Sequence, residues 1–233
     1  MTVNHNSVNS DNRTYRVDWQ TVRRDWPGLL LVAAAWVISL WALPRLPDRV
    51  PIHWNAAGEV DGWGSPLFAA LMVPALATGM YLLLLFLPLI DPRRRNYAYF
   101  GDFYRLMRQA VPGYLALIQA VVLGYALGYP VDPSLFIRLA IPVLFLFMGN
   151  YMGRVRHNYF VGIRTPWTLA SEEVWVRTHR AAARLWVAGS LVMLAAAFLP
   201  GTWGFWVFMA VTAVMVIIPV IHSYLLWRRL ENN

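Results

Sequence analysis

The 233-residue sequence contains no cysteine and no lysine, and it has few charged residues of any kind. The lack of cysteine excludes disulfides, thiolate metal sites and cysteine nucleophiles. Charged residues make up 14% of the chain, against about 25% in an average soluble domain, whereas 58% of the residues are hydrophobic. A water-soluble globular protein is therefore not expected, and the composition indicates an integral membrane protein.

The beginning of the chain lacks the apolar core of a secretory signal peptide. Residues 1–18 are polar and rich in asparagine and serine, which predicts a flexible tail. We therefore expect the first hydrophobic segment to remain in the protein as a membrane anchor.

Six stretches are long and apolar enough to cross a bilayer. A helix needs about 20 mostly apolar residues to cross a hydrocarbon layer about 30 Å thick, and about 17 is near the lower limit. Helices are expected because unpaired backbone groups are costly in lipid. The predicted spans are residues 26–43, 67–90, 109–129, 135–152, 182–200 and 203–227.

The basic residues are distributed unevenly between the two sides of these spans. All 20 are arginine, and only Arg45, Arg49 and Arg138 fall on one side, which leaves 17 on the other. Because arginine-rich flanks mark the cytoplasmic side, both termini are predicted to be cytoplasmic. The fold class expected is an all-α integral membrane protein with six transmembrane helices. It comprises a membrane domain over residues 19–227 and a cytoplasmic C-terminus over residues 228–233.

The net charge of +8 is explained by this arginine-rich flank. Such flanks contact anionic membrane lipids, so membrane lipids are expected partners and nucleic acid is not. Ionisable side chains are missing near the middle of the spans, where only mild polar groups such as Ser39 and Gln119 occur. Since charge in hydrocarbon usually marks an ion or proton pathway, a proton-coupled pump or an ion channel is not expected.

The outer loop, residues 44–66, combines four prolines with three glycines. Proline disfavours helix and glycine permits tight turns, so this loop is predicted to be an ordered cap. Its polar residues lie around Trp54 and Trp63; they are His53, Asn55, Glu59 and Asp61. One interpretation is a pocket for a peptide, a lipid headgroup or a metal. The other is a set of turn residues that bond nearby backbone while the tryptophans anchor the loop at the interface.

Neither a metal nor a cofactor is specified by the sequence. A single histidine among carboxylates is a weak metal signal, and no His-Glu-x-x-His motif is present. No cofactor is therefore predicted, and whether a metal binds the outer loop is left open.

The inner segment, residues 153–181, contains a turn at Gly162 and Thr165-Pro166. Thr168 or Ser171 can then cap a helix that continues into the fifth span. Helical spacing places two stripes on opposite sides of that helix. One contains Glu173, Arg177, Arg180 and Arg184, and the other contains Glu172, Trp175, His179 and Trp186.

We expect the stripe with His179 to face the bundle. Glu172 and His179 are two helical turns apart and cannot pair directly. Candidate partners for them are Asn150, Asn158, Arg164 and Thr178. The segment is either a binding or signalling surface built around Arg164 and Trp167, or a capped helix start with interfacial tryptophans and snorkelling arginines.

Both segments resemble the SdpI family of bacterial multi-spanning proteins, named for an immunity protein against a secreted killing peptide. Residues 46–62 (LPDRVPIHWNAAGEVDG) are similar to an uncharacterised N-terminal domain that often accompanies the family. Residues 158–169 (NYFVGIRTPWTL), followed by Glu173, Trp175, Thr178 and His179, resemble its signature loop. With the six-span layout, the resemblance covers about residues 26–227.

The resemblance implies a multi-pass protein of the bacterial cytoplasmic membrane that gives immunity to a membrane-active toxin peptide. In the best-known case, the toxin-engaged protein also holds a transcriptional repressor at the membrane and so acts as a sensor. The ligand-binding residues predicted outside are His53, Asn55, Glu59 and Asp61. The functional surface predicted inside is formed by Asn158, Arg164, Thr165, Trp167, Glu172, Glu173, Trp175 and His179. No catalytic residue is predicted.

Two other functions stay open. The first is an intramembrane enzyme acting on lipid or peptide, with His53 as general base and Glu59 or Asp61 as its orienting or metal-binding partner. It requires these groups to converge within hydrogen-bond reach. The second is an exporter of an uncharged toxic molecule, which requires a central cavity between the helices.

Overall fold

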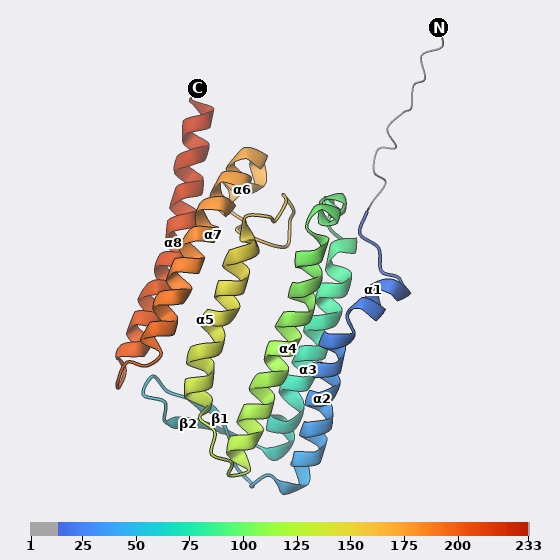
Figure 1. Cartoon of the computed structure of the whole chain (residues 1–233), viewed down its shortest axis with the longest axis vertical. Helices are drawn as coiled ribbons and strands as arrows, with labels where there is room; N and C mark the ends of the chain where they lie inside the picture. The colour runs from blue at the N-terminus through green and yellow to red at the C-terminus, as the bar shows by residue number, and fades with distance from the viewer. Residues whose placement is uncertain (1–13, 233) are drawn as a thin grey trace.

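The computed structural model describes residues 14–232, which form a bundle of six long helices closed at one end by a β-hairpin (Figure 1). Most of the predicted tail, residues 1–13, lies outside the described part. We call the hairpin end of the bundle outer and the opposite end inner, following the predicted orientation.

Each of the six predicted spans overlaps one long helix. The long helices are α2 (Trp26–Ala42), α3 (Pro66–Phe86), α4 (Gly101–Ala126), α5 (Pro133–Met152), α7 (Glu172–Ala196) and α8 (Trp203–Glu231). The shorter elements are α1 (Trp19–Arg24), α6 (Pro166–Ala170), the strands β1 (Val50–Trp54) and β2 (Val60–Gly64), and the 3₁₀ turns η1 (Leu43–Arg45), η2 (Leu87–Leu89) and η3 (Arg94–Tyr99). Helix α4 begins about two turns before its predicted span and α7 nearly three turns before, because their first turns are charged but helical.

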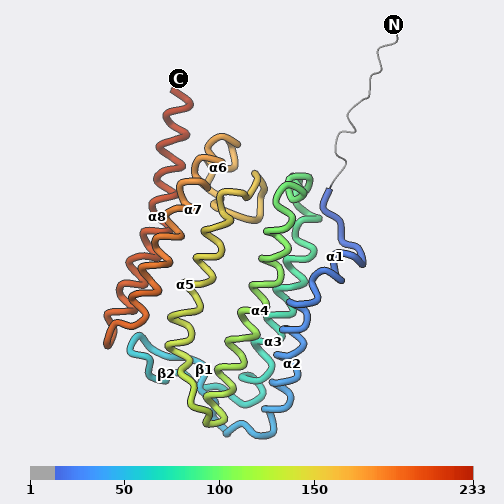
Figure 2. The backbone as a smooth tube through the Cα atoms, in the orientation of Figure 1, coloured from blue at the N-terminus to red at the C-terminus, as the bar shows by residue number. Residues whose placement is uncertain are grey.

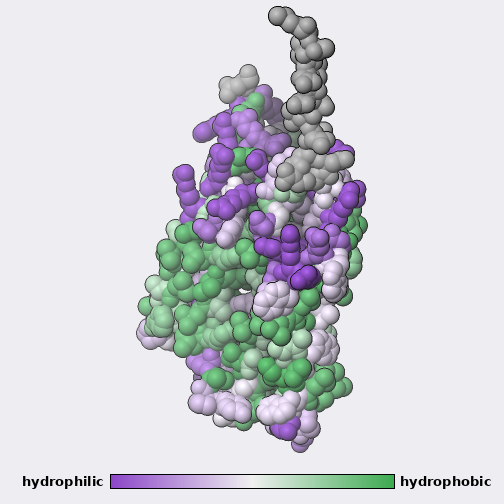
Figure 3. All heavy atoms as spheres, turned by 45° about the vertical axis from the view of Figure 1, so that its right-hand side comes forward, coloured by the Kyte–Doolittle hydropathy of each residue, from purple (hydrophilic) through white to green (hydrophobic). Residues whose placement is uncertain are grey.

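Five helices of the described chain are long and apolar enough to cross a membrane. They lie at Trp26–Arg45, Pro66–Leu89, Gly101–Ala126, Pro133–Met152 and Trp203–Glu231. Helix α7 is equally long, but Arg177, Arg180 and Arg184 make its first half polar. The face in Figure 3 shows a wide apolar band with charged side chains gathered toward the inner end. The fold is therefore that of a mostly helical membrane protein.

The helices form two groups of three. Helices α2, α3 and α4 pack on one another, and α5 and α8 each pack on α7, whereas α4 and α5 join the two groups through a sparser interface. Figure 2 shows the groups side by side, with α6 and the end of α8 at the inner end. The interface between α4 and α5 thus forms a seam across the middle of the molecule.

The outer loop is ordered as an antiparallel hairpin with an irregular register between β1 and β2. The prolines and glycines of this loop predict an ordered cap, but they do not predict strands. The hairpin lies on the bundle through Trp54, whose ring meets Tyr125 edge-on at a centroid distance of 5.8 Å. The Ser134 hydroxyl also donates to the Gly58 carbonyl at 3.3 Å.

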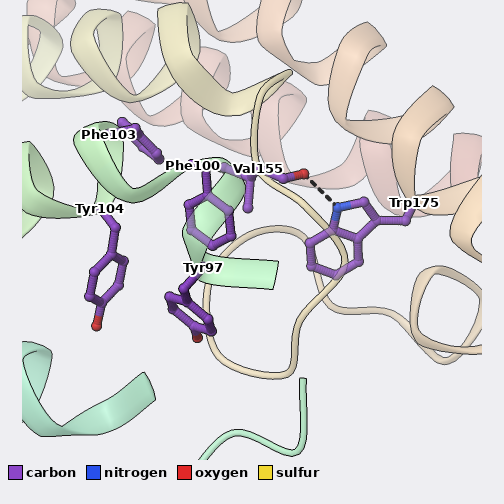
Figure 4. Packing of buried hydrophobic residues seen from close by; sticks show 6 residues of the cluster. All are labelled: Tyr97, Phe100, Phe103, Tyr104, Val155 and Trp175. Atoms are coloured by element: carbon purple, nitrogen blue, oxygen red, sulfur yellow. Dashed lines mark hydrogen bonds between the residues drawn. The ribbon is translucent and has the colours of Figure 1, made fainter. Parts of the chain in front are cut away.

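An aromatic cluster holds the inner end together (Figure 4). It consists of Tyr97, Phe100, Phe103, Tyr104, Val155 and Trp175. The indole N–H of Trp175 donates to the Val155 carbonyl at 2.9 Å. Tyr15 packs against this cluster and donates its hydroxyl to the Leu85 carbonyl at 2.9 Å. The last residues of the predicted flexible tail are therefore anchored to the bundle, because Tyr15 finds both an apolar surface and a hydrogen-bond acceptor.

Candidate functional site

A groove of about 550 Å³ lies at the outer end, between the hairpin, α5 and α8. Its hairpin wall carries His53, Asn55 and Asp61, and Arg138 reaches it from α5. The other wall is apolar and consists of Ile137, Ile141, Phe205, Phe208 and Met209. We call this site the outer groove. A polar wall facing an apolar wall suits an amphipathic ligand.

His53 and Asp61 form the polar centre of the hairpin wall. His53 Nδ1 lies 2.5 Å from Asp61 Oδ1, and the two side chains are 69% and 43% exposed. Gly62 permits this close approach of the strands, since a Cβ there would lie 2.7 Å from the His53 Cβ. His53 therefore bonds a carboxylate rather than the backbone, and the contact orients its imidazole toward the groove region.

Asn55, by contrast, organises the hairpin turn. Its side-chain carbonyl accepts the backbone N–H of Ala57 at 2.9 Å and that of Glu59 at 3.0 Å. Its amide donates to Glu59 Oε2 at 3.2 Å. Glu59 does not line the outer groove. The turn interpretation therefore holds for Asn55. Within residues 14–232, no three His, Asp or Glu side chains are grouped to hold a metal ion.

Asn158 organises the inner segment of residues 153–181, which we call the inner loop, in the same way. It is fully buried, and its side-chain carbonyl accepts the N–H groups of Phe160 at 2.9 Å and Val161 at 2.7 Å. Its amide donates to the carbonyls of Arg156 at 2.8 Å and Val161 at 2.9 Å. A buried asparagine that uses both ends of its amide fixes one loop conformation.

His179 fixes the next part of the inner loop. Its Nε2 accepts the Ile163 N–H at 2.9 Å, so Nδ1 carries the proton and donates to the Trp175 carbonyl at 2.8 Å. The imidazole stacks on Trp175 with ring centroids 4.1 Å apart. Burial lowers the pKa of His179 to about 4, against the opposing effect of its bond to the Trp175 carbonyl. His179 is therefore a neutral structural residue at physiological pH.

Two expectations for the helix stripe of Glu172 and His179 were wrong: the partners of His179 and the burial of Glu172. His179 bonds to Trp175 and Ile163, and none of the four expected partner side chains contacts its ring nitrogens. Glu172 is exposed rather than turned into the bundle. The physical reason is that α7 begins at Glu172, so this residue lies at the free end of the helix before the packed face begins.

Thr165 and Trp167 join the inner loop to α8. The Thr165 hydroxyl accepts the Thr168 N–H at 3.1 Å and caps α6. It also lies 3.0 Å from the Ser223 hydroxyl. The Trp167 ring packs on Tyr224 with centroids 5.0 Å apart. The start of α7 is capped by Ser171, as the sequence suggested.

The predicted inner residues therefore divide into a buried and an exposed group, with Trp167 half-buried between them. Asn158, Thr165, Trp175 and His179 are buried and hold the loop. The exposed residues Arg164, Glu172 and Glu173 remain available to a partner. Glu173 pairs with Arg177 at 2.6 Å, and Arg164 donates to the Tyr159 carbonyl at 3.2 Å.

A buried carboxylate that the sequence did not single out ties the inner loop to the first group of helices. Asp91 accepts the Tyr97 hydroxyl at 3.0 Å and the Tyr159 N–H at 3.1 Å through Oδ2. Its Oδ1 accepts the Arg93 N–H at 2.7 Å. Burial raises the pKa of Tyr97, so its hydroxyl stays protonated and donates. The only sequence signal was an aspartate directly after an apolar span.

A second missed site is the buried ion pair between Asp25 and Arg108. Nε of Arg108 lies 2.6 Å from Asp25 Oδ2, and both side chains are almost fully buried. Tyr81 and Gln109 also donate to Asp25, while Arg108 donates to the Tyr15 hydroxyl at 2.6 Å. Arg108 is one of the 17 arginines counted on the inner side, but it is buried and paired and so does not belong to the exposed part of that flank. Opposite charges at the inner ends of two apolar segments were the available signal.

Comparisons with known protein families give matches that include the outer loop and the inner loop. The model of the SdpI/YfhL protein family matches residues 154–223, and that of a domain of unknown function (DUF1648) matches residues 30–78. The chain is 23% identical over 205 residues to "Immunity protein SdpI" of Bacillus subtilis (strain 168), which covers 88% of this chain and 96% of that protein. No solved structure is significantly similar to the chain.

Proposed function

Because the chain belongs to the SdpI family, we propose that it is an immunity protein of the bacterial cytoplasmic membrane that protects the cell from a membrane-active toxin peptide. The observation that carries this proposal is the similarity to an immunity protein over 88% of the chain. That similarity is supported at both candidate sites, since the two family models cover the outer loop and the inner loop.

The proposal includes six membrane spans with both termini in the cytoplasm. Its support is the position of α8, whose Phe205 and Phe208 line the outer groove while its Ser223 contacts Thr165 of the inner loop. Helix α7 begins beside the inner loop and leads into α8 at the outer end, so it crosses the same apolar band (Figure 1). The arginine-rich end then faces the cytoplasm.

In this proposal the outer groove receives the toxin peptide. Apolar side chains of the peptide lie against Phe205 and Phe208 of α8. Carboxylate or carbonyl groups of the peptide accept hydrogen bonds from Arg138, the one of the three predicted outer-side arginines that lines the groove. Binding at this edge of the bilayer keeps the peptide from disrupting the membrane.

The experiment is survival of toxin-sensitive cells that express this chain and are challenged with the secreted killing peptide. We expect the parent chain to protect, and Arg138→Gln and His53→Ala to protect less. Arg49→Gln is the matched control, because Arg49 is another outer-side arginine but does not line the groove. Full protection by both groove variants, with normal expression, would refute the assignment of the site.

The sensor role is the finer part of the proposal. The exposed side chains of the inner loop, such as Arg164 and Glu172, would bind a cytosolic transcriptional repressor. The test is the location of a fluorescent repressor in cells with and without toxin. Arg164→Ala should release the repressor from the membrane while leaving protection intact. If the repressor never reaches the membrane, the protein is an immunity protein without a sensor role.

A further inference from the structure

Two cavities follow one another along the seam between α4 and α5. The first, of about 690 Å³, lies at the inner end and is lined by the N-terminal segment, η3, α4 and α5. The second, of about 600 Å³, lies further along the same two helices and is also lined by Leu31 of α2. We call them the basic pocket and the apolar groove. Neither belongs to the outer groove or to the signature loop.

The basic pocket has a large excess of positive charge. Arg16, Arg24, Arg105 and Arg154 line it, and Asp102 is the acidic residue among its described lining residues. Asp102 lies 3.5 Å from Arg105, while Arg16, Arg24 and Arg154 are exposed. Guanidinium groups bind phosphate oxygens through paired hydrogen bonds. The pocket therefore suits a phosphate group.

The apolar groove has the opposite character. Its walls are Leu117, Phe136, Leu139, Val143 and neighbouring apolar side chains. Tyr114 also lines it, and its buried hydroxyl has no hydrogen-bond partner within the described chain. A groove of this kind on the side of a membrane bundle suits a hydrocarbon chain.

The two cavities meet at one level of the seam. Tyr151 lines the basic pocket and Phe147, one turn earlier on α5, lines the apolar groove, with ring centroids 5.2 Å apart. On α4, Arg108 lines the pocket and the next residue, Gln109, lines the groove. The lining thus changes from charged to apolar side chains where the charged inner end meets the apolar band, and the face in Figure 3 shows the same change along the molecule.

We propose that this seam binds an anionic phospholipid of the inner leaflet, with its phosphate among the arginines of the basic pocket and one acyl chain in the apolar groove. Tyr114 lies six residues beyond Arg108, about 9 Å along the helix, so it lies beside the acyl chain in the apolar groove rather than beside the phosphate. The inference is independent of the proposed immunity function.

The test is native mass spectrometry of the full chain in detergent, titrated with phosphatidylglycerol or with phosphatidylcholine. We expect tighter binding of phosphatidylglycerol. Each arginine near an anionic lipid contributes about a fivefold gain in affinity. The single variants Arg24→Gln and Arg154→Gln should each weaken binding by about this factor. Arg228→Gln should not, since Arg228 is an exposed inner-end arginine outside the pocket.

A second arm distinguishes a lipid from a free phosphate. Ala140→Phe fills the apolar groove, whereas Ala33→Phe adds the same ring to an exposed position of α2 outside it. We expect only the first to displace phosphatidylglycerol. The proposal is overturned if glycerol phosphate competes at equal concentration, if both lipids bind equally, or if Arg228→Gln weakens binding as much as the pocket variants. Circular dichroism of each variant verifies that it is folded.

Discussion

Nε2 of His179 accepts the backbone N–H of Ile163 at 2.9 Å, and Gly162 lies directly against the same imidazole. A side chain at Gly162 would collide with Nε2 of His179, and its backbone has a φ of +116°. The signature loop is therefore fixed to α7 at a point where only glycine fits.

Gly162→Ala should destabilise the protein more than a positive φ alone explains. A non-glycine residue in the left-handed region costs about 1–2 kcal/mol, and loss of the Ile163 hydrogen bond adds about 1–3 kcal/mol. The matched control is Gly128→Ala, which has a φ of +85° but no atom within 4 Å of its added Cβ. Thermal unfolding in detergent compares the two. Equal losses would contradict the packing of Gly162 on His179.

The protein should lose stability as the pH falls from about 6.5 to about 4. The pKa of His179 is about 4 in the folded protein, below its ordinary value of about 6.5. The unfolded chain therefore binds more protons in this window, and protonation favours unfolding by on the order of 3 kcal/mol. His157, whose pKa is lowered by burial and by Arg93, contributes in the same direction.

His179→Gln separates this effect from general acid denaturation. Glutamine can still accept the Ile163 N–H but does not titrate. The variant should be less stable than the parent at pH 8, with a flatter pH dependence of its unfolding midpoint between pH 6.5 and pH 4. An unchanged slope would show that His179 is not the titrating group.

The buried pair of Asp25 and Arg108 should behave as a coupled unit. Asp25→Asn or Arg108→Gln leaves one buried charge without its partner, and the expected loss is about 3–5 kcal/mol for each. The double variant removes both charges and should lose less than the sum of the single variants. A double-mutant cycle on thermal unfolding measures this coupling, and strict additivity would contradict the pairing.

Tyr97 should contribute through its hydroxyl group. Tyr97→Phe removes the hydrogen bond to Asp91 and should cost about 1–2 kcal/mol. Tyr99→Phe is the control, since Tyr99 lies on the same 3₁₀ turn and is 69% exposed. Unfolding in detergent should show a lower midpoint for the first variant only; equal midpoints would show that the bond from Tyr97 to Asp91 does not stabilise the fold.

Hydropathy and charge predict the positions of the helices well because each signal is summed over a stretch of many residues. The same periodicity correctly placed Trp175 and His179 on the packed face of α7. Hydropathy does not show where a helix begins outside the apolar band, which is why α4 and α7 are longer than their predicted spans.

Hydropathy and helical periodicity could not predict contacts between segments that are distant in the sequence. The sequence places Asp25 and Arg108 83 residues apart, and nothing local distinguishes a paired arginine from a solvated one. The strands β1 and β2 were missed because proline and glycine obscure the alternation that usually marks a strand. The outer groove needed the fold as well, since α8 lies far along the chain from the hairpin.

Photo-crosslinking of the killing peptide to the outer groove tests the central claim most directly. A photoreactive amino acid at position 208 points into the groove, whereas position 206, two residues earlier on α8, carries a Trp that is 61% exposed and does not line it. With peptide added outside intact cells, we predict crosslinks from position 208 and none above background from position 206. Equal crosslinking from both positions, or from neither in cells that are protected, would contradict peptide binding in the outer groove.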